Sequence, residues 1–251
     1  PSPIAARNHG PATPAGAVDR PPPLGVVVGI YAGRVGMLPH GRASVRSAIV
    51  KTAVEGGVYL STDGLEGDEQ ADRRHHGGPN KAVLVFPVEH YRARSASPAG
   101  SLPAGTLGEN FSTRGLLEQD VCIGDIFSVG ESVVQVTQPR RPCFKLGARH
   151  QIPDLAARLQ RTGQTGFYLR VLKPGVVQAG ATMRLTVAAA HGMTLAEVNR
   201  VMNLDKTDVR GIRHILRAGA DLPVAWQAQL RERLANPKWV DDDGERLAGG
   251  E

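Results

Sequence analysis

The stretch that decides the fold class is Asp125-Ile-Phe-Ser-Val-Gly-Glu-Ser-Val-Val-Gln-Val-Thr137. It holds two short runs rich in β-branched and aromatic residues, 125–129 and 132–137, with a glycine in the link between them. Short runs of this kind, bounded by glycine or proline, are typical of the strands of a barrel or a sandwich. They do not fit repeated βαβ units, in which a helical pattern follows each strand.

The same strand-like pattern recurs along much of the chain. Further runs cover residues 26–31, 81–86, 166–172 and 183–189, and glycine and proline separate them. Two short helices are expected among these runs, one beginning at Pro87 and one over residues 153–159, since proline suits the first position of a helix. The sequence therefore predicts a mainly β domain over residues 24–190 with a few short helices.

The pattern changes after residue 192. Thr194 and Glu197 form a capping box, which is a start signal for a helix. Three sets of apolar residues at helical spacing then predict three short helices: Leu195, Val198 and Met202; Val209, Ile212, Ile215 and Leu216; Val224, Trp226 and Leu230. The expected organisation is a flexible lead-in over residues 1–23, the β domain, a three-helix element over residues 191–235, and a polar, frayed tail over residues 236–251.

The composition narrows the class of protein. The chain has 251 residues, of which 41% are hydrophobic and 22% charged, and these fractions are ordinary for a globular protein. No apolar run approaches the roughly 20 residues of a membrane span, and no secretory signal is recognisable, so we expect a cytoplasmic protein without membrane contact. The net charge of +6 permits phosphate-bearing ligands but does not require nucleic acid. The oligomeric state stays open.

Cys143 is the residue best placed to carry chemistry. It lies in the loop Gln138-Pro-Arg-Arg-Pro-Cys-Phe-Lys-Leu146. Arg140, Arg141 and Lys145 surround it with positive charge, which favours the thiolate, the form that attacks electrophiles and ligates soft metals. The two prolines keep the loop rigid. We therefore expect Cys143 to be a functional thiol.

The second cysteine, Cys122, lies between two apolar residues and is expected to be a small core residue. Nothing indicates an oxidising compartment, so both cysteines are expected to be free thiols. No Cys-x-x-Cys pair is present, which disfavours thiol exchange, and no signature supports a Cys-His protease built from Cys143 with His75 or His76. A zinc site would need more nearby ligands. A site with one sulfur suits a metal whose other ligands come from a cofactor.

Two further polar segments are candidates for the same site. The first, residues 67–79, ends in His75-His76-Gly77-Gly78-Pro79. Adjacent histidines point to opposite sides of an extended chain, so His75 and His76 would make a poor metal pair. The second segment, residues 107–112, places Asn110 beside a glycine and an acid, where backbone and amide groups could meet a polar ligand. Such residues also occur in plain turns, so this second signal is weak by itself.

Four segments together resemble a MOSC domain, the module named for the C-terminal part of molybdenum cofactor sulfurases. They are Gly67-Asp68 with Asp72-Arg-Arg-His-His-Gly-Gly-Pro-Asn-Lys-Ala-Val83, then Gly108-Glu-Asn-Phe-Ser-Thr-Arg-Gly115, then Val121-Cys-Ile-Gly-Asp-Ile-Phe127, then Gln135-Val-Thr-Gln-Pro-Arg-Arg-Pro-Cys-Phe-Lys-Leu146. The resemblance covers residues 24–190. Residues 191–235 resemble the three-helix C-terminal element of the bacterial subfamily linked to 6-N-hydroxylaminopurine resistance.

This resemblance implies a MOSC-type β-barrel with a pocket at one end, in which Cys143 ligates the molybdenum of a molybdenum cofactor (molybdopterin). It also implies that the pocket residues contact the pterin, its phosphate or the substrate, and that these residues are Arg140, Lys145, Asn110, His75, His76, Gly77 and Gly78. Arg140 is the best physical candidate for the phosphate, because its guanidinium presents a fork of donors.

The implied activity is a molybdenum-dependent reduction of N-hydroxylated substrates, such as hydroxylaminopurine bases, to amines. The sequence shows no flavin or iron–sulfur motif, and two cysteines cannot form a Cys₄ cluster. Electrons would therefore come from a separate reductase or another external donor. His75 or His76 is the expected proton donor near neutral pH, and His76 is the catalytic candidate beside Cys143.

Two alternatives stay open. In one, Cys143 carries a persulfide for sulfur transfer, which needs the same fold and the same thiolate. In the other, the C-terminal helices form the helix-turn-helix of a DNA-binding regulator, because the second helix carries Arg210, Arg213, His214 and Arg217. These charges are also usual on a solvated helix face, and this helix lacks the Gln and Asn residues that read bases. Packing or partner docking is therefore favoured over nucleic-acid binding.

Overall fold

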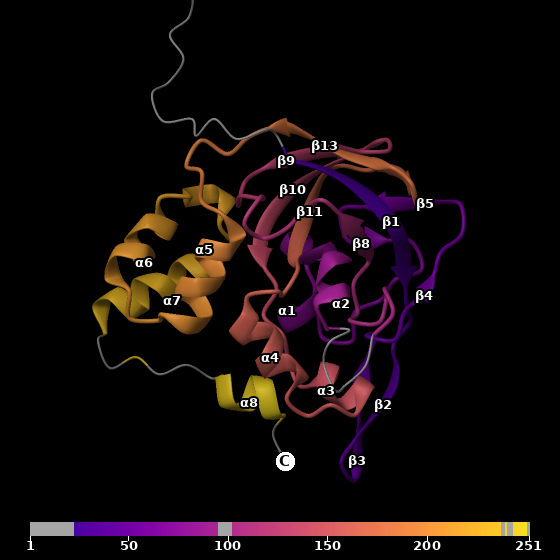
Figure 1. Ribbon diagram of the computed structural model, residues 1–251, viewed down its shortest axis with the longest axis horizontal. Coiled ribbons are helices and arrows are strands. Elements are labelled where there is room, and N and C mark those ends of the chain that lie inside the picture. The colour runs from indigo at the N-terminus through magenta and orange to yellow at the C-terminus, as the bar shows by residue number, and fades with distance from the viewer. Residues whose placement is uncertain (1–22, 95–101, 237–238, 240–242, 250–251) are drawn as a thin grey trace, which may run out of the picture.

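The computed structural model describes residues 23–94, 102–236, 239 and 243–249. The expected flexible lead-in therefore lies outside the described residues, apart from Pro23. A β-barrel forms one part of the structure, and helices from the C-terminal region pack beside it (Figure 1). The prediction of a mainly β fold with short helices and a C-terminal helical element is confirmed. None of the helices in the described ranges combines the length and apolar character that a membrane crossing needs.

Seven strands close the barrel. They are β1 (Leu24–Ala32), β7 (Val83–Pro87), β8 (Phe111–Arg114), β9 (Ile126–Val129), β10 (Ser132–Pro139), β11 (Phe167–Lys173) and β13 (Thr182–Val187). Their order is β13-β9-β10-β11-β7-β8-β1, and β1 pairs again with β13, where Leu24 lies opposite Arg184. All neighbours are antiparallel except β7 and β8, which are parallel. Closure satisfies the strand edges that an open sheet would expose.

Shorter strands lie outside the barrel wall. They are β2 (Gly36–His40), β3 (Ala43–Ser47), β4 (Thr52–Ala53), β5 (Gly57–Ser61), β6 (Gly64–Leu65) and β12 (Gly175–Gln178). β2 pairs with β3, and β12, β5 and β6 form a three-stranded sheet. The sequence does not predict these strands, because they are short and carry few consecutive alternations of apolar and polar residues.

The barrel interior is filled by alternate residues of the wall strands, as the period of two requires. On β1, Val27 and Ile30 are buried while Val26 lies on the outer face. The change of phase between Val27 and Ile30 coincides with a bulge where β1 pairs with β8. Completely buried phenylalanines from three different strands meet in the core, namely Phe111, Phe127 and Phe167.

Four short helices accompany the barrel: α1 (Arg73–His76), α2 (Glu89–Arg94), α3 (Lys145–His150) and α4 (Leu155–Thr162). α2 and α4 match the two predicted helices, and each begins two residues later than expected. α1 and α3 are not predicted by the sequence pattern, because each is too short to show a helical period. A second apolar cluster joins α2, α3 and α4 through Phe86, Tyr91, Leu107, Leu146, Leu155 and Leu159.

α1 corrects the expectation that His75 and His76 lie in an extended segment. The backbone N–H of His76 donates to the carbonyl oxygen of Asp72 at 2.9 Å, which closes a helical turn. Gly78 follows with a φ of 87°, a conformation that favours glycine. The backbone at both histidines is therefore helical and not extended.

The C-terminal helical element shares the core of the barrel. It consists of α5 (Leu195–Asn199), a π-helical turn (Arg200–Leu204), α6 (Val209–Leu216) and α7 (Val224–Ala235). The predicted capping residue Thr194 caps α5, since its Oγ1 accepts from Glu197 N at 3.2 Å. Asp208 caps α6 in the same way, because its Oδ1 accepts from Gly211 N at 2.8 Å. Val198, Ile212 and Leu230 belong to the same buried cluster as the barrel interior.

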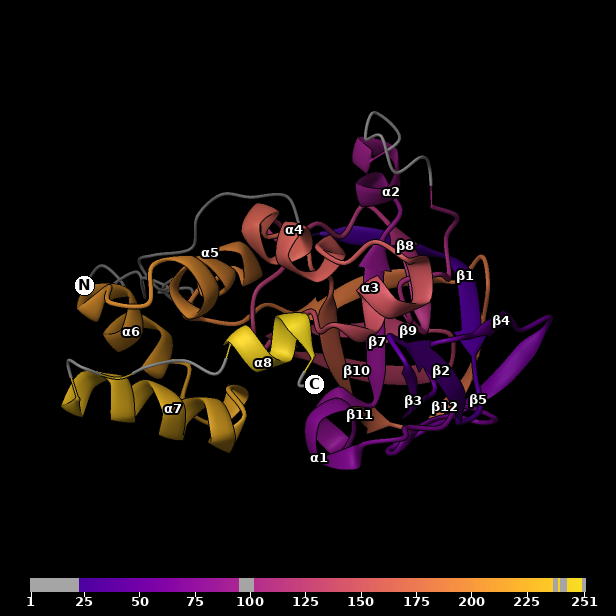
Figure 2. The ribbon, with the colours of Figure 1, turned by 90° about the horizontal axis from the view of Figure 1, so that it is seen from below.

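The expectation of a frayed tail from residue 236 is wrong for its second half. The chain forms α8 (Asp243–Ala248), which lies between the C-terminal helices and the barrel (Figure 2). Asp243 forms ion pairs with Arg141 of the barrel and with Lys206 of the helical element. The polar sequence of this segment predicts a frayed tail, but ion pairs with residues distant in the sequence fix it against the rest of the protein.

Leu230→Ala tests whether barrel and helices unfold as one unit. Leu230 is completely buried in the shared core, so its truncation should lower the free energy of unfolding by about 2–5 kcal/mol. Val224 is 78% exposed on the same helix, so Val224→Ala is the matched control and should stay within about 0.5 kcal/mol of wild type. Urea unfolding is followed by circular dichroism and by tryptophan fluorescence. A separate early transition of the helices would contradict a shared core.

Candidate functional site

A pocket lies beside the barrel wall, next to the end of β10, the start of β8 and the paired residues Tyr168 of β11 and Leu84 of β7. Its wall includes Lys81, Asn110, Arg140, Cys143, Lys145 and Tyr168. The enclosed volume is about 90 Å³, well below the roughly 300–1,000 Å³ of typical small-molecule sites. The pocket therefore has room for a group of a few atoms.

Cys143 reaches this pocket from the loop between β10 and α3. Arg140 N donates to Gly166 O at 2.9 Å, which continues the contact of β10 with the chain that leads into β11. The chain then turns through Pro142 and Cys143, and Leu146 N donates to Cys143 O at 3.1 Å. Cys143 is 7% exposed and lines the pocket, so its thiol is buried among polar neighbours and not in the apolar core.

His76 is the nearest polar partner of the thiol among the hydrogen bonds of the described residues. Its Nε2 lies 3.8 Å from Cys143 Sγ, although 67 residues separate the two along the chain. Burial lowers the pKa of His76 to about 4, and the positive charges of Lys145 and Arg140 add to this effect. The ring is therefore neutral near pH 7, which argues against the expectation that His76 donates a proton there.

Positive side chains surround the thiol. Arg140 is 5% exposed, and its Nη1 is buried with no hydrogen-bond partner among the described residues. Such an unmade hydrogen bond costs on the order of 1–3 kcal/mol, so this nitrogen favours an acceptor in the pocket. Lys81 lies 6.0 Å from the centroid of the Tyr168 ring, and Lys145 also lines the pocket. The cluster suits an anionic group.

The opposite wall is a braced network around Asn110. The Oδ1 atom of Asn110 accepts from Leu84 N at 3.0 Å, and its Nδ2 donates to Asp68 Oδ2 at 2.8 Å and to Tyr31 O at 3.2 Å. Both amide hydrogens are therefore used inside the protein. Asp68 is further held by an ion pair with Lys51. Asn110 lines the pocket, but its amide serves first to fix Asp68 and the neighbouring strands.

A buried carboxylate lies behind this wall. Glu109 is completely buried, and it accepts hydrogen bonds from Gly105 N at 2.7 Å, Leu107 N at 3.0 Å and Ser112 Oγ at 2.9 Å, and from the Tyr91 hydroxyl. Burial and the charge of Glu109 raise the pKa of Tyr91 well above its usual value, so the hydroxyl remains a donor. These bonds fix the backbone of residues 105–112, and with it the position of Asn110.

The pocket brings together five residues that the sequence proposes for the site: Cys143, His76, Arg140, Lys145 and Asn110. Gly77 and Gly78 are absent from its lining, and a Cβ on Gly77 would approach Gln70 Oε1 to 2.7 Å. These glycines therefore shape the turn that follows α1. The side chain of His75 lies outside the described part of the structure.

Sequence reasoning misses several lining residues, among them Lys51, Asp68, Lys81 and Tyr168. Lys81 carries the clearest signal in the sequence, because it is a basic residue directly before the apolar run Ala82-Val-Leu-Val-Phe86. Asp68 belongs to the candidate segment 67–79, but Lys51 shows no such signal and becomes recognisable only through its ion pair with Asp68.

The donor set fits a metal that a cofactor brings with it. Within the described ranges, no group of three or more His, Cys, Asp and Glu residues could hold a metal ion. Cys143 offers one sulfur, so a soft metal there would take most of its ligands from a bound cofactor. The buried, partnerless nitrogen of Arg140 and the adjacent lysines suit an anionic part of that cofactor, such as a phosphate.

Comparisons with known proteins agree with the barrel and with the pocket motifs. The family model of the MOSC domain matches residues 72–184, which include His76 and Cys143. The chain is 38% identical over 228 residues to Protein YiiM of Escherichia coli (strain K12), a match that covers 88% of this chain and 98% of that protein. It is 37% identical over 207 residues to Uncharacterized protein YflK of Bacillus subtilis (strain 168), covering 82% and 93% of the two chains.

A solved structure and a fungal protein extend this likeness. The crystal structure of YiiM from Escherichia coli aligns with a TM-score of 0.73 and 32% identity, over 90% of this chain and 99% of that one. A protein named "Reductase" from Gibberella moniliformis is 36% identical over 185 residues, and the match covers 72% of this chain and 33% of the fungal protein. Because the barrel, the motifs and the likeness over nearly full length agree, the chain belongs to the MOSC domain family.

Proposed function

We propose that the protein is a molybdenum-cofactor-binding oxidoreductase that reduces N-hydroxylated substrates, such as hydroxylaminopurine bases, to amines. The observation that carries the proposal is that one pocket contains both a thiol and an unpaired cationic nitrogen. The thiol is that of Cys143, whose Sγ lies 3.8 Å from His76 Nε2. The nitrogen is the buried Nη1 of Arg140, which has no hydrogen-bond partner among the described residues. A thiol ligand and a cation in need of an acceptor are what an anionic, metal-bearing cofactor requires.

The pocket residues have separate roles in this proposal. Cys143 would hold the metal through its sulfur, while Arg140 and Lys145 would bind the phosphate and hold the cofactor in place. The cofactor, when bound, supplies the two-electron chemistry. The wall of Asn110, Asp68 and Lys51 is already satisfied within the protein, so it would limit how far substrate and water can enter.

The proposed reaction balances as R–NHOH + 2 e⁻ + 2 H⁺ → R–NH₂ + H₂O. The N–O bond breaks, the nitrogen is reduced, and the hydroxyl oxygen leaves as water. Two cysteines cannot supply a Cys₄ iron–sulfur cluster, so a separate reductase or external donor would deliver the electrons. The fungal relative that carries the name "Reductase" supports the reaction class, although this chain corresponds to only 33% of that protein.

The two protons need a source in the pocket. His76 is a poor one near pH 7, because its pKa is lowered to about 4. Lys81 is the better candidate: burial, reinforced by the positive charge of Arg141, lowers the pKa of its ammonium and makes it a stronger acid than an exposed lysine. In this proposal Lys81 donates, and solvent at the open mouth of the pocket returns the proton to it.

Cys143→Ser tests the ligand role. We expect the variant to lose molybdenum, pterin and hydroxylaminopurine reduction when it is purified from cells that make the cofactor, because a hydroxyl is a poor ligand for a soft metal. Cys122→Ala is the matched control, since Cys122 is a buried core residue, and it should retain all three. Metal analysis, pterin fluorescence and amine formation are the measurements. Full retention of molybdenum by Cys143→Ser would refute the proposal.

The same preparation separates the reductase from the persulfide alternative. A sulfur carrier would contain sulfane sulfur on Cys143 and no molybdenum, whereas the proposed enzyme contains molybdenum and pterin in about equal amounts. Cyanolysis measures the sulfane sulfur. Wild-type protein that is rich in sulfane sulfur and free of metal would replace the proposal by the alternative.

His76→Gln tests the neutral histidine. The folded pKa of about 4 lies below the unfolded value of 6.5, so the unfolded chain binds more protons and wild type loses stability as pH falls from 6.5 to 4. Glutamine does not titrate. Between pH 7 and pH 5 the variant should therefore lose less free energy of unfolding than wild type, by about 2 kcal/mol. Urea unfolding at both pH values measures this, and equal losses would contradict the lowered pKa.

Arg140→Met tests the unpartnered cation. Methionine has a similar length without charge, so the variant should be as stable as wild type or more stable by about 1 kcal/mol when no cofactor is bound, while cofactor content falls. Arg161 is exposed on α4, and Arg161→Met is the control that should change neither quantity. Urea unfolding and molybdenum analysis are compared. A destabilised Arg140→Met variant with full cofactor content would contradict the assignment.

A further inference from the structure

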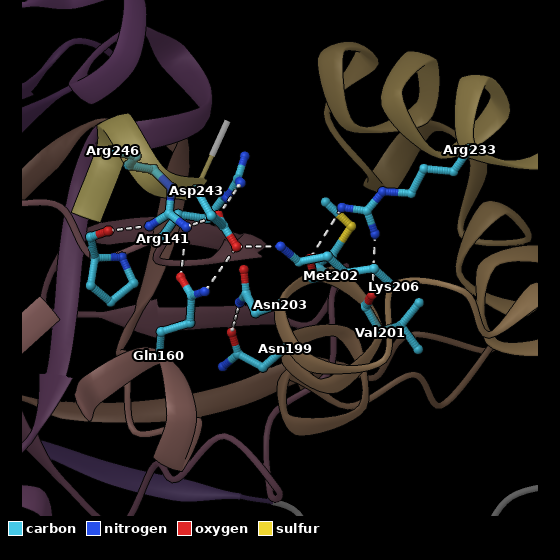
Figure 3. A network of polar contacts seen from close by, with 11 residues as sticks. Arg141, Gln160, Asn199, Val201, Met202, Asn203, Lys206, Arg233, Asp243 and Arg246 are labelled. Carbon is cyan, nitrogen blue, oxygen red and sulfur yellow. Dashed lines mark hydrogen bonds and ion pairs between the residues drawn. The ribbon is translucent and has the colours of Figure 1, made fainter. Parts of the chain in front are cut away.

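α8 packs against the loop that carries Cys143, and its charged residues form a network with the barrel (Figure 3). Asp243 Oδ1 accepts from Arg141 Nη2 at 3.1 Å, and Asp243 Oδ2 accepts from Gln160 Nε2 at 3.1 Å. Asp243 also pairs with Lys206 and with Arg246. One carboxylate thus joins the loop before Cys143, α4, the helical element and α8.

Arg246 holds the two residues on either side of Cys143. Its Nη1 donates to the carbonyl oxygen of Pro142, and its own carbonyl oxygen accepts from Phe144 N at 2.9 Å. Its Nη2 donates to Gln160 Oε1 at 2.6 Å, which anchors the guanidinium on α4. The peptide units before and after Cys143 are therefore both tied to a single residue of α8.

The ion pairs of Asp243 and Arg246 are partly buried, so water screens them less than it screens surface ion pairs. The side chains of Arg246 and Asp243 are 15% and 18% exposed, well below the exposure of surface ion pairs that contribute little. Burial alone would raise the pKa of Asp243, but hydrogen bonds from Lys206 and Arg246 lower it far below its usual range. Asp243 is therefore charged at every pH at which the protein would act.

We propose that Asp243 and Arg246 are positioning residues for Cys143, so that the C-terminal helix α8 completes the pocket by fixing the direction of the thiol. Arg246 fixes the backbone on both sides of the cysteine, and Asp243 fixes Arg141 and orients Arg246. The consequence for catalysis rests on the proposed function, because a metal ligand needs a defined direction. The positional part does not depend on any cofactor.

The test is the rate at which iodoacetamide labels Cys143 in the cofactor-free full chain, with peptide mass spectrometry to separate the two cysteines. Loss of a charged hydrogen bond in Arg246→Ala should raise the population of the open loop, and the labelling rate, about tenfold. Arg246→Lys keeps one charged donor for Pro142 O and should return the rate close to that of wild type. Arg161→Ala, on the exposed face of α4, is the matched control and should leave the rate unchanged.

Cys122 is an internal reference in the same experiment, because it is 4% exposed and packed in the core. Faster labelling of Cys143 with unchanged Cys122 supports local release of the loop. Parallel acceleration of both cysteines would mean global unfolding and would overturn the proposal, as would equal rates in Arg246→Ala and Arg161→Ala. Should Arg246→Ala fail to fold, Asp243→Asn is the second variant, with a smaller rise expected.

A measurement on cofactor-loaded protein separates this inference from the proposed function. Arg246→Ala should lower kcat for hydroxylaminopurine reduction more than it changes KM, and Arg246→Lys should restore kcat. If Cys143→Ser keeps its molybdenum, the proposed function fails while the labelling result stands. If Cys143 is a ligand but labelling and kcat are indifferent to Arg246→Ala, the positioning role alone fails.

Discussion

The closure of the barrel by β1 and β13 is the constraint on which the rest of the structure depends. Within the closed wall, Gln138 lies opposite Tyr168 and Tyr168 lies opposite Leu84, so the end of β10, the start of β11 and β7 are neighbours. Thr137 Oγ1 of β10 also donates to Asn80 O at 2.7 Å, which ties the chain that follows α1 to the end of β10. His76 and Cys143 can therefore lie 3.8 Å apart although 67 residues separate them. The closed wall also supplies the core on which the C-terminal helices pack.

The pocket keeps its charges unbalanced on one side and balanced on the other. Lys51 and Asp68 neutralise each other, with Asn110 as their brace, whereas the buried Nη1 of Arg140 has no partner among the described residues. Folding alone gains nothing from such a nitrogen, since a methionine would avoid the cost. The cation is thus better explained by a ligand than by stability. Burial is the main cause of the lowered pKa of His76, and the same cations add to it.

Much of the fold could be predicted from the sequence, because the C-terminal helices carry helical periods and the wall strands other than β8 appear as apolar runs. β8 (Phe111–Arg114) is not predicted as a strand. Cys143 could also be selected, since three cations stand near it in the chain. The rest depends on contacts between distant segments. The sequence suggests Asn110 as a ligand contact, but its amide is used by Leu84, Tyr31 and Asp68. The helical turn at His76 is too short to show a period.

α8 contacts the loop between β10 and α3, which no neighbouring strand in the described part of the chain holds in place. Up to Arg140, whose N–H donates to Gly166 O, the chain of β10 is fixed by its neighbour. Beyond that point the path to α3 leaves the sheet, and Pro142 has no N–H to donate. Its buried carbonyl still needs a donor, and that donor comes from Arg246, 104 residues later. The barrel wall can therefore position Arg140 and the Asn110 network. The backbone on both sides of Cys143 is held instead by Arg246 of α8.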